Sequence, residues 1–153
     1  MRRFLSLLLI LSLFLSLLSS CRAEPSAYDM LSEFVAVYGA EGVIYSPEIS
    51  EGRPGYVQDG MMERIYIFHG SFPKNYAVYL NTGISVFSEC GVFLCDDADT
   101  LLRIEESCLE RVALLTKGDG RGFVSISGNR VFYSTMQEKE RAERIWREII
   151  RKY

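Results

Sequence analysis

The stretch ISVFSECGVFLCDDADTLLRIEESCLERVALL, residues 84–115, predicts a long strand, an acidic corner and a helix of several turns. The strand half, 84–95, is apolar on both sides of its alternation. One side carries Ile84, Val86, Cys90, Val92 and Leu94, and the other carries Phe87, Phe93 and Cys95. A strand with two apolar faces is usually covered on both, so we expect 84–95 to lie in the interior of its sheet.

The helix half begins at three carboxylates, Asp96, Asp97 and Asp99. Carboxylates cap the N-terminus of a helix and stabilise the positive end of its dipole, and these two roles explain the three residues without a metal. They lack the glycine and the distal glutamate of a calcium-binding loop. Apolar residues then recur at helical spacing, and Lys117-Gly118 predicts the C-terminal stop.

The remaining chain supplies more strands and helices around this unit. We expect a helix over 27–38 with a Ser26–Asp29 capping box. Residues 61–68 fit a short helix, but 64–69 also fit an extended segment. Strands are predicted over 76–80, 123–126 and 130–133, with Asn81-Thr82-Gly83 as a tight turn into the central strand. A final helix follows a second capping box at Thr135 and Glu138, with Trp146 on its inner face.

A hairpin followed by a helix therefore occurs twice. This order predicts an α+β fold, a single mostly antiparallel sheet with helices packed on it, built as two ββα units. Residues 117–122 are rich in glycine, but they follow a helix and precede a strand. A phosphate-binding loop needs the reverse order, so we read them as a connector.

The N-terminus has the features of an export signal. Arg2 and Arg3 precede fifteen residues, 4–18, that are only Phe, Leu, Ile and Ser. That run is short for a membrane span and typical of a signal peptide. It ends at Ser19-Ser20-Cys21, which resembles the bacterial lipobox, so we expect 1–20 to be removed and Cys21 to be lipidated. Ordinary cleavage after Ala23, which would give a free secreted domain, is the alternative.

Removal of the first 20 of 153 residues would leave 133, enough for one α+β domain over 27–153 behind a short tether, 21–26. The removed segment carries two arginines and no acids, so the rest has 15 basic and 20 acidic residues, a net charge of −5. This balance argues against nucleic acid and against electrostatic binding to anionic lipid. An acyl anchor at Cys21 would then be the contact with the membrane.

Three further cysteines, Cys90, Cys95 and Cys108, show no zinc-ligand spacing. Cys90 and Cys108 come level if the helix folds back on the strand, but a helix and sheet pack about 10 Å apart. A disulfide needs a Cα separation of about 4.4–6.8 Å, so we expect buried free thiols.

Several short motifs look like those of a family of small uncharacterised bacterial lipoproteins. They are Glu89-Cys90-Gly91-Val92-Phe93, the helix end at Glu110-Arg111-Val112, Tyr66 and Tyr76-Ala77-Val78-Tyr79. The resemblance covers most of 27–152. It implies a secreted, lipid-anchored α+β domain of unknown function, and it supplies no catalytic residues.

Two sets of side chains are candidates for function. Glu89 stands mid-strand on the side of Phe87 and Phe93. A carboxylate there needs a partner such as Arg111 or Arg103, or an opening to solvent. The aromatic residues between 56 and 79 exceed the needs of a loop, so we take Tyr56, Tyr66, Phe72 and Tyr76 as a candidate contact surface.

The sequence therefore favours a membrane-tethered, extracytoplasmic binding module with no cofactor and a partner in the cell envelope. The alternative is a small envelope hydrolase in which His69, the only histidine, activates Cys90, Cys95 or Ser71. No nucleophile motif surrounds these residues, and we expect no enzyme activity.

Overall fold

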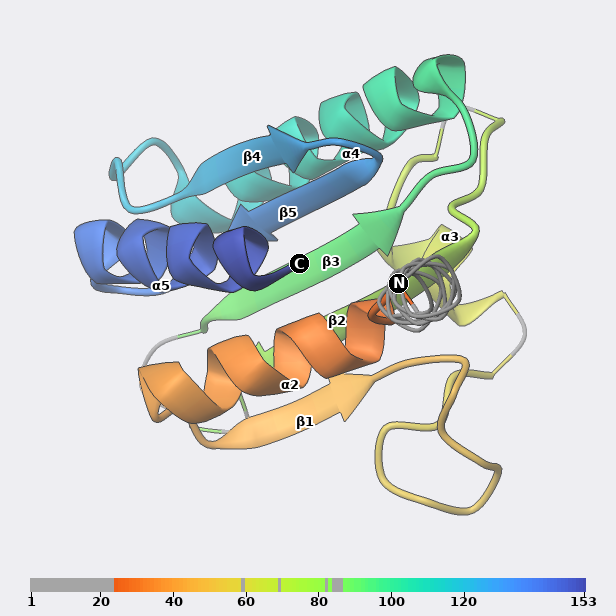
Figure 1. The fold of residues 1–153 in the computed structure, drawn as a ribbon, viewed down its shortest axis with the longest axis horizontal. Coiled ribbons are helices and arrows are strands. Elements are labelled where there is room, and N and C mark those ends of the chain that lie inside the picture. Colours follow the sequence, from red (N-terminus) through yellow and green to blue (C-terminus); the bar gives the residue numbers. More distant parts are fainter. Residues whose placement is uncertain (1–23, 59, 69, 82, 84–86) are drawn as a thin grey trace, which may run out of the picture.

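A computed structural model describes residues 24–58, 60–68, 70–81, 83 and 87–153. Its centre is one five-stranded sheet with strand order β1-β2-β3-β5-β4, and all four pairings are antiparallel. Figure 1 shows the strands running across the molecule with helices on both faces. The strands are β1 (Gly42–Tyr45), β2 (Asn75–Asn81), β3 (Glu89–Leu94), β4 (Phe123–Ser127) and β5 (Arg130–Ser134).

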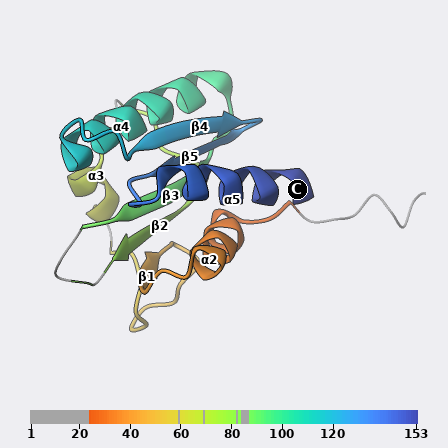
Figure 2. The ribbon, with the colours of Figure 1, turned by 90° about the vertical axis from the view of Figure 1, so that its left-hand side faces the viewer.

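Four helices accompany the sheet in the part of the chain that the structure describes: α2 (Ala27–Tyr38), α3 (Met61–Ile65), α4 (Ala98–Thr116) and α5 (Lys139–Lys152). The predicted α+β class with one antiparallel sheet is confirmed. The order β2-β3-α4 and β4-β5-α5 is also present, but α4 and α5 cover opposite faces of the sheet (Figure 2).

The strand β3 is buried at every position and lies between β2 and β5, as its two apolar faces predicted. Cys90, Val92 and Leu94 face α2 and α5, whereas Phe93 and Cys95 face α4. The predicted strand was too long at its start, because β3 begins at Glu89. Residues 84–86 lie outside the described residues, and Phe87 is 50% exposed rather than covered.

The connection from β2 to β3 is also longer than predicted. β2 ends at Asn81 and β3 begins at Glu89, so the chain is not turned by Asn81-Thr82-Gly83 alone. One backbone bond, from Asn81 N to Ser88 O at 3.0 Å, extends the ladder beyond the strand ends.

Helix ends follow the caps in the sequence in two cases and depart from them in a third. Ser26 and Asp29 form the capping box of α2, and Asp97 caps α4 through a 2.8 Å bond from Thr100 N. The predicted box at Thr135 and Glu138 is wrong, because Thr135 is buried and bonded to Glu89, and Glu138 caps α5 without a side-chain bond. The Thr135 hydroxyl bonds to the backbone at the start of β3 instead of the backbone at the start of α5.

The three described cysteines are free and buried. The expectation of free thiols is confirmed, but the reason is not the helix–sheet distance on which it was based. Cys90 faces α2 and α5, whereas Cys108 belongs to the cluster on the opposite face, so the sheet itself separates them.

Candidate functional site

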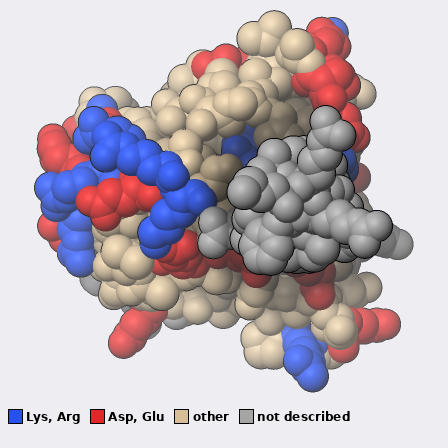
Figure 3. Space-filling model, in the orientation of Figure 1, with Lys and Arg blue, Asp and Glu red and all other residues tan. Residues whose placement is uncertain are grey.

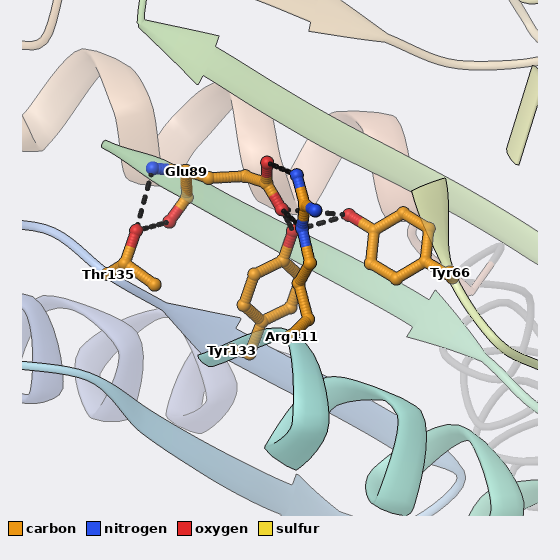
Figure 4. Close-up of polar contacts among 5 residues, drawn as sticks. All are labelled: Tyr66, Glu89, Arg111, Tyr133 and Thr135. Carbon is orange, nitrogen blue, oxygen red and sulfur yellow. Dashed lines mark hydrogen bonds and ion pairs between the residues drawn. The ribbon is translucent and has the colours of Figure 1, made fainter. Parts of the chain in front are cut away.

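Glu89 is the one carboxylate among the described residues that is fully buried, with 0% of its surface exposed. It opens β3, and the alternation of that strand turns its side chain toward α4, on the same face as Phe93. Burying an unpaired carboxylate is very unfavourable, so the surrounding groups must compensate its charge. Those groups come from α4, from β5 and from Tyr66, the C-cap residue that follows α3 (Figure 4).

Arg111 of α4 pairs with this carboxylate in a two-pronged ion pair. Its Nε donates to Oε1 at 2.8 Å and its Nη2 donates to Oε2 at 2.7 Å. Of the two predicted partners, Arg111 is the correct one, whereas Arg103 lies nearer the start of α4 and pairs with Asp99 at 3.0 Å. The carboxylate raises the pKa of Arg111 well above its usual range by hydrogen bonding to the charged guanidinium.

Two tyrosines complete the cluster. Tyr133 of β5 donates its hydroxyl to Oε1 of Glu89, Tyr66 donates to the same oxygen at 3.3 Å, and the two hydroxyls contact each other. The two hydroxyl groups have only two hydrogens for these three contacts, so one hydrogen is shared between two oxygens. The Arg111 guanidinium also lies 5.8 Å from the centroid of the Tyr66 ring, within cation–π range.

Gly91 makes room for this arrangement. It pairs with Tyr133 across β3 and β5, and a Cβ at Gly91 would lie 2.6 Å from Cε1 of the Tyr133 ring. A side chain there would push the ring away, and its hydroxyl would leave Glu89. The cluster therefore requires Gly91, which the sequence analysis did not single out. The signal was a glycine inside a strand, next to Cys90, because such a glycine often marks the close approach of another group.

The backbone of Glu89 is held as firmly as its side chain. Its N–H donates to Oγ1 of Thr135 at 2.9 Å, and its carbonyl accepts bonds from Thr135 N at 2.8 Å and Thr135 Oγ1 at 3.0 Å. The cluster therefore joins β3 to β5, to α4 and to the end of α3. A buried carboxylate already bound to a guanidinium and two hydroxyls suits a structural clamp better than a proton-transfer group.

Both tyrosines of the cluster resist ionisation. Burial raises the pKa of Tyr66 and of Tyr133 well above 10, and the charge of Glu89 adds to the effect in each case. Their contribution to stability is complete below the pKa of about 10 of an unfolded tyrosine, and it is lost as the pH rises toward the folded pKa.

We therefore expect alkaline unfolding, with the buried tyrosines ionising only as the fold is lost. Tyrosinate absorbance and far-ultraviolet circular dichroism, followed together above pH 10, test this. In the double variant Tyr66→Phe/Tyr133→Phe, the free energy of unfolding should fall less steeply with pH above 10 than in the wild type, because the two buried groups that ionise are gone. Full tyrosinate absorbance with an unchanged dichroism spectrum would contradict the expectation.

The four aromatic residues predicted as a contact surface do not form one. Tyr66 and Tyr76 are buried in the core beneath α4, 3% and 8% exposed, and Tyr56 is half-buried. Phe72 is exposed, and its ring packs against Tyr76 at 5.9 Å between centroids. Most of this aromatic content builds the core between the sheet, α3 and α4.

The hydrolase candidates are not brought together in the part of the chain that the structure describes. His69 lies outside the described residues. Cys90 and Cys95 are buried, and burial raises the pKa of the Cys90 thiol and raises that of Cys95 to about 11. A protonated, buried thiol is a poor nucleophile.

The acidic corner serves the start of α4. Asp97 caps the helix, and the bonds it accepts from Thr100 lower its pKa. Asp96 pairs with Lys74 at 3.3 Å. Over residues 24–153, apart from the few positions not described, no group of three or more metal-ligating side chains occurs.

Comparison with protein-family models, with curated proteins and with solved structures found no match for this chain. Among the described helices, none is both long enough and apolar enough to cross a bilayer.

Proposed function

We propose that this protein is an extracytoplasmic lipoprotein, anchored to the cell membrane through Cys21, whose domain over 27–153 is a non-catalytic binding module. The observation that carries the proposal is the order basic residues, apolar run, Ser19-Ser20-Cys21 at the start of the chain. A folded domain follows that cysteine almost at once, since α2 begins at Ala27.

The start of the domain supports a short tether. Glu24 pairs with Arg130 at 3.1 Å, and the backbone N–H of Ala27 donates to the Asn75 side chain at 3.1 Å. These contacts fix the chain to the sheet three and six residues after Cys21. An anchor there would hold the domain close to the lipid surface, with little freedom to reorient.

The chemistry of the domain supports binding over catalysis. Its buried charged cluster is fully paired, and its described thiols are buried and protonated. A module that acts by binding needs an exposed surface and a stable scaffold, and the Glu89–Arg111 cluster contributes to the scaffold.

Metabolic labelling tests the anchor. Cells expressing the wild type and given a fatty-acid analogue should incorporate the label, because Cys21 would carry the acyl chains. Cys21→Ser should abolish the label, whereas Cys95→Ala, which removes a thiol from the folded domain, should retain it. An unlabelled wild type whose mature chain begins at Glu24 would show that the protein is secreted rather than anchored.

A further inference from the structure

The two outer edges of the sheet are treated differently. The edge of β1 is covered at its C-terminal end by the segment that follows it, since Ser46 N donates to Gly55 O at 3.1 Å and Ser46 bridges to Tyr56. Gly55 lies so close to this edge that a Cβ on it would be 2.1 Å from the carbonyl oxygen of Ile44. Covering an edge in this way prevents pairing with another chain.

The edge of β4 is open. The two-residue turn after Ser127 places Ser127 and Ser125 in hydrogen-bonded pairs with β5, so Val124 and Ile126 direct their N–H and C=O groups outward. Within the described residues, no hydrogen bond to these outward groups is present. The strand has no charge and no proline, which are the usual protections of a free edge.

A cavity of about 200 Å³ lies beside this edge, between β4 and α5. Its lining residues are Phe123, Val124, Ser125, Glu143, Trp146 and Arg147. The indole N–H of Trp146 is buried and has no hydrogen-bond partner among the described residues. A free strand edge next to a side-chain cavity is the arrangement by which sheets bind extended peptides.

The charge beside the edge favours an acidic occupant. The helix α5 carries six basic and three acidic residues, although the whole chain has a net charge of −3. Figure 3 shows the basic side chains gathered over α5. The two charged residues among those lining the cavity are Arg147 and Glu143, and the helical spacing puts Arg144 and Arg151 on the side of Arg147, so the net charge beside the cavity is positive. A second copy paired through β4 would instead bring two positive helices to one face.

We propose that the β4 edge binds an extended polypeptide segment of another protein, with an acidic side chain of that segment seated in the cavity at Arg147. The segment would add a sixth strand and exchange backbone hydrogen bonds with Val124 and Ile126. This inference rests on the proposed role as a binding module, but it does not depend on the lipid anchor.

Selection from a displayed library of random ten-residue peptides, with the purified full-length protein in detergent as bait, tests the proposal. Enriched peptides should lack proline and carry Asp or Glu among β-branched residues. Their binding should change the emission of Trp146, the only tryptophan, and slow amide exchange at Val124 and Ile126. Absence of enrichment over an empty support would overturn the proposal.

Two variants test the edge and the charge separately. Ile126→Pro removes one outward donor but leaves the ladder to β5 intact, so it should weaken binding by about tenfold or more, whereas Ile126→Thr, which keeps the donor, should not. Arg147→Glu should weaken acidic peptides and strengthen the same peptides with Lys in place of the acid. Dichroism and the unliganded Trp146 emission check that each variant folds.

Other outcomes decide against this occupant. Equal binding of the selected peptides by Ile126→Pro would place them elsewhere on the domain. A concentration-dependent dimer that Ile126→Pro abolishes would identify a second copy as the occupant. Peptide binding by a protein that carries no lipid label would refute the anchor while leaving the β4 site standing.

Discussion

Arg111→Met should lower the free energy of unfolding by about 3–5 kcal/mol, because it leaves the charge of Glu89 buried without its partner. Only the hydroxyls of Tyr66 and Tyr133 would remain to solvate the carboxylate. A typical domain has about 5–15 kcal/mol of stability, so the variant should be marginally folded. Urea titration followed by the emission of Trp146 measures the loss.

The double variant Arg111→Met/Glu89→Met separates the pair from its surroundings. Removing both charges leaves apolar groups of similar volume, which is often neutral or stabilising, so most of the lost stability should return. The tyrosine hydroxyls would still contact each other. Arg103→Met on the same helix is the matched control, since its exposed pair with Asp99 should contribute no more than about 1 kcal/mol.

A loss below about 1 kcal/mol in Arg111→Met would contradict the clamp, because a buried, charged Glu89 without Arg111 cannot be so well tolerated. It would mean that solvent reaches the carboxylate. Full recovery in the double variant, by contrast, would show that each charge is needed only because the other is buried beside it, and that the ion pair adds little net stability.

Local patterns were sufficient for most of the scaffold. The two apolar faces of residues 84–95 predicted an interior strand, of which Glu89–Leu94 forms β3, and the side-chain caps at Ser26 and Asp97 predicted two helix starts. Each of these features depends on residues within a few positions of each other. Glu89 was also recognisable as a carboxylate in need of a partner, because its position on an apolar face follows from the period of a strand.

The choice of that partner was beyond the sequence. Arg103 and Arg111 stand two turns apart on one helix, and only the position of α4 along the sheet decides which one reaches Glu89. Tyr66 and Tyr133 stand 23 and 44 residues from Glu89 in sequence, so their hydroxyls could not be assigned to it. Thr135 was misread for the same reason, since its hydroxyl bonds to a strand 46 residues earlier and not to the following helix.

The contrast between the sheet edges was likewise hidden in the sequence. Hydrophobic alternation indicates strands but not their order, and β4 follows β5 in space although it precedes it in the chain. An uncharged strand such as Phe123–Ser127 is unremarkable in the interior of a sheet. It becomes a binding surface only where the topology leaves it at an edge.

Trp146→Ala should lower the free energy of unfolding by about 3–5 kcal/mol, through loss of buried area and the cavity that remains. Trp146 is 2% exposed, and its ring stacks on Phe132 with centroids 4.1 Å apart and planes at 12°. This contact joins α5 to β5, the strand between β3 and the edge strand β4. Truncation before Gln137 should remove the whole contact and unfold the domain.

Two controls show whether the indole itself is responsible. Trp146→Phe keeps a ring against Phe132 and should lose clearly less stability than Trp146→Ala. Arg144→Ala, on the exposed side of the same helix, should change stability by no more than about 0.5 kcal/mol. Urea titration followed by far-ultraviolet dichroism allows comparison of all three variants, because the signal does not depend on tryptophan.

The emission of the wild type provides an independent measurement on the unmodified protein. A docked α5 should give blue-shifted Trp146 emission that iodide quenches poorly, since the ring is covered by Phe132 and by the side chains of α5 and β4. Water-like, readily quenched emission, together with a small loss of stability in Trp146→Ala, would mean that α5 detaches from the sheet. The cavity beside β4 would then lose one of its walls, because Glu143, Trp146 and Arg147 all lie on α5.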